Sequence, residues 1–157
     1  NLLRVRLGET QLQFEHDQLV LLETNIDDMN PEVFGYLTDR LFHDGALDVT
    51  MTPVYMKKGR PGTMLSVLAP ETEATRFADF LLRETTTLGV RMTRVTRRKL
   101  TRGQRTVETE YGPVRVKTAQ VGGGERITPE YDDCVRVAGE QGIPLIDVYD
   151  AVRQAAN

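Results

Sequence analysis

The hydrophobic pattern of the first hundred residues predicts strands and helices in alternation. A short apolar run within residues 18–26 is typical of a buried strand. Apolar residues recur at helical spacing over 33–42. They follow the Asn-Pro-Glu sequence of 30–32, a typical helix start because Asn caps free N–H groups and Pro fits the first turn. Gly45 is expected to end this helix in the left-handed conformation.

The region continues with two more strands, a second helix and a last strand. Alternation over 47–52 predicts a half-buried strand, which a turn at 57–62 joins to a returning strand at 63–69. A second helix is expected to open at Pro70, and an arginine-rich strand to occupy 90–100. This βαββαβ order is that of a ferredoxin-like sandwich, so we expect an α+β fold with two helices on one face of an antiparallel sheet. The other face would be covered or would join copies of the chain.

A smaller lobe of one hairpin and two helices is expected after residue 100. Residues 111–113 predict the hairpin turn, and the three glycines of 122–124 a flexible joint. One helix is expected to start at 128–130 and to end at Gly142, and another to start at Pro144. The apolar stripe of the first of these helices is formed by Tyr131, Cys134, Val135 and Ala138.

The length of 157 residues fits one domain with a small appendage. We divide the chain into a ferredoxin-like subdomain, 1–100, and a small α+β subdomain, 101–157. Residues 2–14 alternate weakly and are expected to be an edge strand or the tail of another domain. The chain begins at Asn1 without Met and looks cut from a longer protein.

The composition excludes several classes of protein. The formal net charge is -3, so no overall basic field would draw the chain to nucleic acid or to acidic lipid. A single cysteine excludes an intrachain disulfide framework and a zinc cage built from cysteines. The sequence contains no long uncharged apolar run, so it predicts neither a transmembrane helix nor a signal peptide. We expect a reducing, cytoplasmic location.

Two adjacent carboxylates close the first predicted strand. Asp27 and Asp28 stand before the helix cap, and their oxygens are hard ligands that suit a divalent cation. Asp is also common in such turns, and adjacent strand residues point to opposite sides. Metal binding and simple turn formation are therefore both open.

Three cations close the second strand. Lys57, Lys58 and Arg60, interspersed with glycine, suit a phosphate group, and a solvated hairpin tip is the alternative. The residue order of a Walker A loop is missing. Acid at one loop and base at another, both at strand ends, indicates a site for a metal-bound polyphosphate.

Two further polar groups have both functional and plain interpretations. The threonines of 85–87, between Arg83 and Arg91, would bind phosphate or ribose, or would only complete a frayed helix end. A basic strand and linker contains Arg94, Arg97, Arg98, Lys99, Arg102 and Arg105. Without interleaved aromatic residues, this stretch favours a solvated edge or a salt-bridged subunit contact over nucleic-acid binding.

Soft metal ligands are nearly missing. Cys134 lies on an apolar helical stripe and is expected in the core, and His16 and His43 are isolated. The chain therefore offers almost no thiolate or imidazole for nickel, copper or zinc.

Five stretches carry a resemblance to a known family. They are Glu23–Glu32, Met56–Gly62, Arg83–Arg91, Tyr111–Lys117 and Pro129–Cys134. Together they resemble the nickel insertion proteins, pyridinium bisthiocarboxylic acid mononucleotide nickel chelatases that make the nickel-pincer cofactor of lactate racemase. The resemblance covers the C-terminal part of that family's proteins, so their N-terminal domain with its His-rich segment would be missing.

The resemblance implies a CTP-dependent nickel chelatase of the lyase class. Nickel, a substrate ion, would be inserted into the organic precursor while CTP is cleaved to CMP and pyrophosphate. The C-terminal domain would bind CTP with Mn or Mg, and the missing domain and the sulfurs of the precursor would handle nickel. The resemblance and an open sheet face together imply a ring-like homo-oligomer, a trimer or a hexamer.

Transferred to this sequence, the resemblance places the nucleotide in the subdomain of 1–100. Asp27 or Asp28, with Glu23 the less favoured, would hold the divalent ion. The nucleotide would be bound by Lys57, Lys58, Arg60, Thr86, Thr87 and Arg91. No catalytic residue is identified, and the isolated fragment would bind CTP with or without turning it over.

Two functions of other classes fit the same residues. The first is a non-catalytic ferredoxin-like regulatory module that senses a small anion and forms oligomers. The second is a single-strand nucleic-acid module that uses the basic strand, against which the net negative charge counts. We expect neither nucleic acid nor a membrane as a partner.

Overall fold

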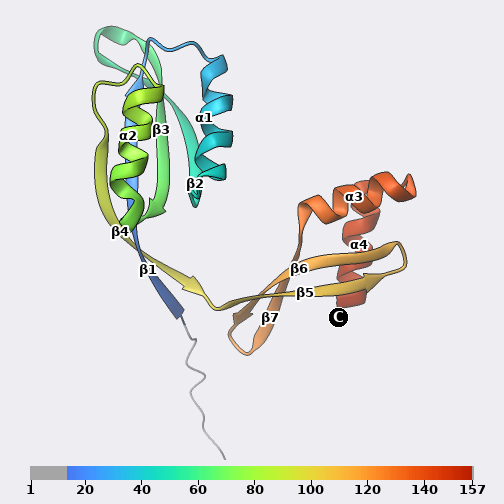
Figure 1. The fold of residues 1–157 in the computed structure, drawn as a ribbon. Helices are drawn as coiled ribbons and strands as arrows, with labels where there is room; N and C mark the ends of the chain where they lie inside the picture. The colour runs from blue at the N-terminus through green and yellow to red at the C-terminus, as the bar shows by residue number, and fades with distance from the viewer. Residues whose placement is uncertain (1–13, 157) are drawn as a thin grey trace, which may run out of the picture. The chain divides into compact units, whose positions relative to one another are not determined.

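The computed structural model describes residues 14–156, which divide into two compact units (Figure 1). The larger unit is His16–Arg98. The smaller unit contains Phe14, Glu15 and the described residues from Lys99 onward. Each unit has its own cluster of buried apolar side chains.

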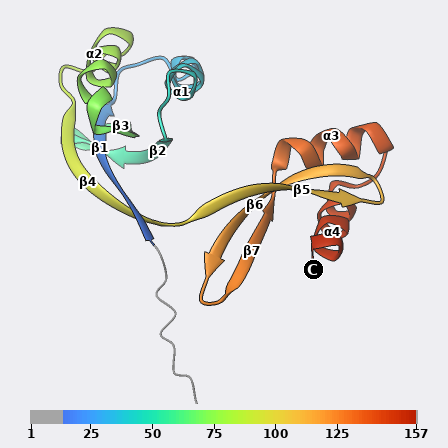
Figure 2. The same ribbon diagram turned by 60° about the horizontal axis from the view of Figure 1, so that its bottom comes forward.

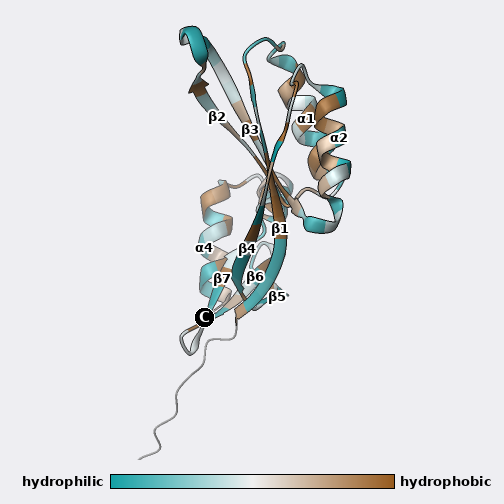
Figure 3. Ribbon diagram, turned by 90° about the vertical axis from the view of Figure 1, so that its left-hand side faces the viewer, coloured by the Kyte–Doolittle hydropathy of each residue, from teal (hydrophilic) through white to brown (hydrophobic). Residues whose placement is uncertain are grey.

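The larger unit has the predicted ferredoxin-like order of elements. These are β1 (Phe14–Ile26), α1 (Glu32–His43), β2 (Asp48–Tyr55), β3 (Pro61–Pro70), α2 (Ala74–Glu84) and β4 (Arg91–Leu100). The sheet order is β2-β3-β1-β4, and β3 is antiparallel to both β1 and β2. Both helices lie on one side of the sheet (Figure 3). The α+β sandwich prediction is therefore confirmed.

The core of this unit lies between the sheet and its two helices. Alternate residues of β1 and β3 face the helices, because the strand period is two. The largest fully buried side chains here are Leu22, Leu37, Leu41, Leu65, Val67, Phe77 and Leu81.

The first helix begins at Glu32 with Pro31 as its N-cap, one residue later than predicted, and ends just before the predicted glycine. The Asn30 Oδ1 atom accepts a hydrogen bond from the Glu32 N–H at 3.1 Å, which satisfies one of the free donors of the first turn. Gly45 follows the helix with φ +96°, a conformation that glycine adopts without steric cost. Phe42, expected on the inner stripe, is instead exposed near the end of the helix.

The sheet has an exposed edge and an open second face. β2 is an edge strand whose Met51 side chain is exposed, so the expected half-buried strand is largely solvated. On the face away from the helices, Leu21 pairs with Leu68 and Glu23 with Ser66, all partly exposed.

Two arginines of the other edge strand, β4, form ion pairs within the chain. Arg94 contacts Glu71 at 2.6 Å and Arg97 contacts Asp17 at 2.6 Å. These pairs lie within the chain, and each carboxylate already neutralises a cation that nucleic-acid binding would need.

The smaller unit is a three-stranded antiparallel sheet with two helices (Figure 2). Its elements are β5 (Arg102–Thr109), β6 (Gly112–Val121), β7 (Gly124–Pro129), α3 (Tyr131–Gln141) and α4 (Leu145–Ala156). The hairpin predicted around 111–113 is confirmed as the β5–β6 turn. Its core is formed by Val107, Val114, Val116, Cys134, Val137, Val148 and Val152.

The flexible joint expected at 122–124 is wrong. Gly122 and Gly123, with φ +54° and +91°, form a tight turn, and Val121 pairs with Gly124 across it. Two successive positive φ angles suit a two-residue hairpin turn, whose twist matches that of the strands. Because β7 is short and largely polar, its apolar alternation is too weak to predict a strand.

The predicted start and inner face of α3 are also partly wrong. Residues 128–129 end β7, and the helix begins at Tyr131. Tyr131 and Val135 are exposed, whereas Val137 is buried with Cys134. The buried stripe thus follows a spacing of three residues from Cys134, and the position of the sheet selected it.

Within the described residues, no helix combines the length and the apolar character needed to cross a membrane. The weak alternation of residues 2–13 lies outside the described part of the chain.

Candidate functional site

One polar hollow of about 350 Å³ gathers most of the predicted site residues. It lies in the larger unit, where the end of β1, the β2–β3 turn and the α2–β4 connection meet. Its lining includes Asp27, Asp28, Lys57, Arg60, Thr86 and Thr87. Six of the nine predicted side chains, which come from three separate stretches, therefore share one cavity.

The β2–β3 turn approaches the end of β1 closely. A Cβ atom at Gly62 would lie 2.8 Å from the Ile26 carbonyl oxygen and 2.9 Å from the Met56 Sδ atom. Such contacts are too short for a real side chain, so glycine lets the turn lie directly beside Asp27. The antiparallel pairing of Ile26 with Thr63 fixes the same approach.

The cationic turn has a defined backbone. Residues Lys57–Gly59 form a single 3₁₀ turn, which the Met56 N–H closes by donating to the Arg60 carbonyl oxygen at 2.8 Å. Lys58 is the one non-glycine residue with positive φ in the described chain, at +63°. This conformation is rarely adopted without glycine and is common at ligand sites.

The two acids have different partners. The Arg60 Nη1 atom donates to the Asp27 Oδ2 atom at 3.3 Å, and the Asp27 side chain is only 17% exposed. The Thr86 hydroxyl instead donates to the Asp28 Oδ1 atom. Asp27 is thus paired with a cation, whereas Asp28 is exposed and has a hydroxyl as its partner.

The three predicted residues outside the lining lie beside it. Arg91 donates to the Asn25 Oδ1 atom at 2.9 Å, and Asn25 lines the hollow. Glu23 precedes Asn25 by two residues and points to the same face of the sheet. Lys58 follows the lining residue Lys57 in the turn.

A second, more apolar hollow of about 310 Å³ adjoins the first. Its lining includes Met29, Pro31 and Phe34, and it shares Ile26 and Asp27 with the polar hollow. The two cavities together suit a ligand with an anionic part and a flat, less polar part.

A divalent ion fits the polar hollow only with help from a ligand. Among residues 14–156, no group of three His, Cys, Asp or Glu side chains is arranged to hold a metal. The donors at hand, chiefly Asp28, are hard oxygens. Mg²⁺ and similar ions often use one or two carboxylates and take further oxygens from phosphate and water.

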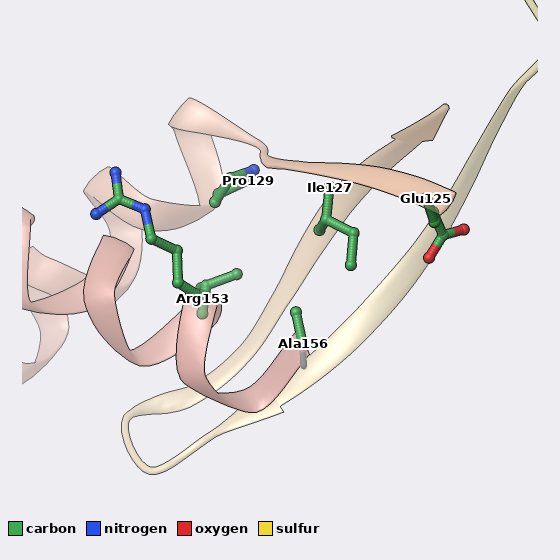
Figure 4. Close-up of a pocket in the computed structure, with 6 residues that line it drawn as sticks. Glu125, Ile127, Pro129, Arg153 and Ala156 are labelled. Carbon is green, nitrogen blue, oxygen red and sulfur yellow. The ribbon is translucent and has the colours of Figure 1, made fainter. Parts of the chain in front are cut away.

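The smaller unit has a cavity of its own, but none of the nine predicted residues lines it. A hollow of about 240 Å³ lies between β7 and α4, with Ile127 and Ala156 directed toward it (Figure 4). Cys134 is buried in the core of this unit, as predicted, and burial raises the pKa of its thiol.

Five lining residues were missed by the sequence analysis: Asn25, Ile26, Met56, Leu88 and Gly89. The sequence did indicate Asn25, since it is a polar residue two positions before Asp27 and therefore on the same face of the strand. The other four had no such signal, because their role follows from where the turns meet.

Comparison with known proteins identifies the family. The family model described as nickel insertion protein matches residues 1–149. A putative nickel insertion protein of Dictyoglomus thermophilum is 50% identical over 94% of this chain and 38% of its own length. A pyridinium-3,5-bisthiocarboxylic acid mononucleotide nickel insertion protein of Acetivibrio thermocellus is 49% identical over 99% of this chain and 38% of its own length.

Solved structures agree with this assignment. The C-terminal domain of a cyclometallase involved in synthesis of the NPN cofactor of lactate racemase, in its apo form, matches with a TM-score of 0.85 and 39% identity. The match covers 90% of this chain and 99% of that domain. A Methanopyrus kandleri protein matches with a TM-score of 0.67 and 27% identity, over 93% of this chain and 92% of its own. The chain therefore belongs to the nickel insertion protein family, and it spans about two fifths of the length of the curated relatives it matches.

Proposed function

We propose that this chain is the part of a CTP-dependent nickel chelatase that binds CTP with Mn or Mg. The observation that carries the proposal is the shared cavity, in which two acids, two cations and two hydroxyls from three stretches line one hollow. Cations and the Thr86 hydroxyl suit a polyphosphate, and a carboxylate suits the metal that accompanies it. The Thr87 hydroxyl lines the same hollow but is bonded within the chain.

The whole protein would insert nickel into an organic precursor. The Acetivibrio relative is named for insertion of nickel into pyridinium-3,5-bisthiocarboxylic acid mononucleotide, and the matched domain belongs to a cyclometallase. We extend that activity to the full-length protein, with nickel as a substrate ion. The hard donors of the hollow suit nickel poorly, so we assign nickel to the sulfurs of the precursor and to the N-terminal domain of the relatives.

The cations would hold the triphosphate. Lys57 and Arg60 line the hollow on one side, and Arg91 approaches it through Asn25. Guanidinium and ammonium groups form charge-assisted hydrogen bonds to phosphate and stabilise negative charge that develops on a leaving pyrophosphate.

Of the predicted acids, Asp28 is the better metal ligand. Asp27 already pairs with Arg60, so metal binding there would cost that ion pair. Asp28 is exposed and would exchange only a neutral hydroxyl partner. A bound Mn or Mg ion would neutralise charge on the polyphosphate. The adjoining apolar hollow, with Phe34 and Met29, is the place for the nucleobase.

Calorimetric titration with CTP tests the proposal. We expect the chain to bind CTP with Mn more tightly than CTP alone or UTP with Mn. Lys57→Ala is expected to weaken binding about ten- to a hundredfold, since one charged hydrogen bond contributes about 1.5–3 kcal/mol. Lys117→Ala, in the smaller unit, is the matched control and should bind as the unchanged chain does.

The opposite pattern would favour the anion-sensing module. Binding of pyrophosphate as tight as that of CTP, without dependence on metal or base, would contradict nucleotide recognition. Steep salt-dependent binding of single-stranded RNA would instead support the nucleic-acid alternative.

A further inference from the structure

Thr24 is a polar residue in an apolar part of the fold. It lies in β1 between Leu22 and Ile26, on the face that packs against the helices, and is 1% exposed. A buried hydroxyl without a partner is destabilising, because it loses its hydrogen bonds to water and gains none in return. Its hydrogen bonds therefore decide whether the strand tolerates threonine at this position.

Both partners of Thr24 lie in the connection from α2 to β4, residues 85–90. The Thr24 Oγ1 atom contacts the Thr87 Oγ1 atom and lies 3.1 Å from the Gly89 carbonyl oxygen. The Thr87 Oγ1 atom lies 3.0 Å from the same carbonyl and accepts from the Gly89 N–H at 3.3 Å. The two threonine hydroxyls and the Gly89 carbonyl oxygen make three contacts with one another but share only two hydroxyl protons. One threonine hydroxyl therefore donates to the other threonine hydroxyl, and this second hydroxyl donates to the Gly89 carbonyl oxygen.

This arrangement commits the Thr87 hydroxyl to the protein. Thr85 is also used internally, because its hydroxyl donates to the Leu81 carbonyl oxygen at 2.7 Å at the end of α2. Of the three threonines, Thr86 is the one whose hydroxyl crosses the hollow, to Asp28. The connection is thus fastened to the core on one side and presents Thr86 to the site.

The same connection forms one wall of the polar hollow. Thr86, Thr87, Leu88 and Gly89 are four of the residues that line it. Leu88 is fully exposed, and Val90 packs against the core only at the far end of the connection. The hydrogen bonds to Thr24 hold the part between them, and they link the wall to β1, which ends just before Asp27 and Asp28.

We propose that Thr24 is a positioning residue of the nucleotide site. Its buried hydroxyl holds residues 85–90 as the wall opposite the cationic turn, although it touches no ligand itself. This inference rests on the proposed function, because the ligand that the wall would contact is the metal-bound nucleotide.

Two measurements on Thr24→Val test it, because valine keeps the shape and removes the hydroxyl. Hydrogen exchange of the ligand-free chain should show faster exchange at the Gly89 amide and its neighbours. Affinity for CTP with Mn should fall about tenfold or more. Thr24→Ser should restore both within about threefold, because serine keeps the hydroxyl. Thr118→Val, at the other buried threonine, is the control and should change neither.

Three results for Thr24→Val would overturn the inference. They are unchanged amide exchange in residues 85–90, unchanged affinity for CTP with Mn, or a loss of affinity without faster exchange. If Thr24→Val does not fold, Thr87→Val breaks the Thr24–Thr87 contact and leaves the Thr24 contact with the Gly89 carbonyl. Unchanged exchange at the Thr86 and Leu88 amides in that variant would equally contradict the role. If the unchanged chain binds no CTP, the proposed function fails, while the exchange of Thr24→Val still decides whether Thr24 holds the connection.

Discussion

Lys58 shows how a single residue separates stability from function in this turn. Its φ of +63° places an L side chain in the left-handed region, which costs about 1–2 kcal/mol. Gly59 follows with φ +69°, so the turn needs two such residues in succession and uses glycine for only one. A lysine at the strained position is consistent with a demand for positive charge beside the hollow.

Replacing Lys58 by glycine should relieve the strain and remove the charge. We expect the free energy of unfolding of Lys58→Gly to equal that of the wild-type chain or to exceed it by up to about 1 kcal/mol. Glycine removes the backbone strain of the folded turn, but it also gives the unfolded chain more conformational freedom, and the two effects partly cancel. Affinity for metal-bound CTP should fall. Urea unfolding and calorimetry measure the two quantities, and a destabilised Lys58→Gly variant would show that the lysine stem stabilises the turn.

The junction of β6 and α3 shows how one side chain joins two elements. β7 ends at Pro129, so the Arg115 N–H of β6 has no further strand to bond. The Asp133 Oδ2 atom accepts from this N–H at 2.9 Å and from the Arg115 Nε atom at 2.9 Å. These bonds hold the pKa of the Asp133 carboxyl well below its usual range, with the Arg115 side chain the largest cause.

Acid should therefore weaken the smaller unit through Asp133. Its folded pKa is depressed, so its contribution is fully present above the unfolded pKa of about 3.9 and is lost as pH falls below that value. Asp133→Asn should be less stable than the unchanged chain at pH 7, and the difference should shrink at pH 3. Urea unfolding at both pH values, monitored by hydrogen exchange of the β6 and α3 amides, measures this difference in stability. Asp132→Asn is the control, and a difference that stays constant with pH would contradict the linkage.

At the scale of the whole molecule, residues 14–156 form two separate hydrophobic clusters with no shared residue. Leu37 and Phe77 lie in the cluster of the larger unit, and Val148 and Val152 in that of the smaller unit. Each unit thus has the apolar burial that stabilises a fold. The division proposed from the sequence, near residue 100, predicts that the two clusters unfold independently.

Core truncations in each unit test this independence. Leu37→Ala should destabilise the larger unit by about 2–5 kcal/mol through lost burial and a cavity. It should leave hydrogen-exchange protection of β6 and α4 unchanged. Val148→Ala is the reciprocal variant and should spare β1 and β3. Loss of protection in both units from either change would show one cooperative domain.

The sequence by itself determined the order of elements and the chemistry of the loops. Strand and helix periods, the Asn30 cap and the Gly45 stop are local signals, because each depends on residues within a few positions of one another. The same locality placed the acids of 27–28 and the cations of 57–60 at strand ends. Prediction from local pattern failed for β7, because its short polar sequence has no apolar alternation.

Only the tertiary structure decided which loops meet and which side chains are already in use. The approach of Gly62 to Ile26 depends on strand pairing, and it brings Arg60 to Asp27 and leaves Asp28 to Thr86. The bond from Thr24 to Thr87 joins residues 63 positions apart. Pairing at such separations follows from how the whole core packs, so no local pattern contains it.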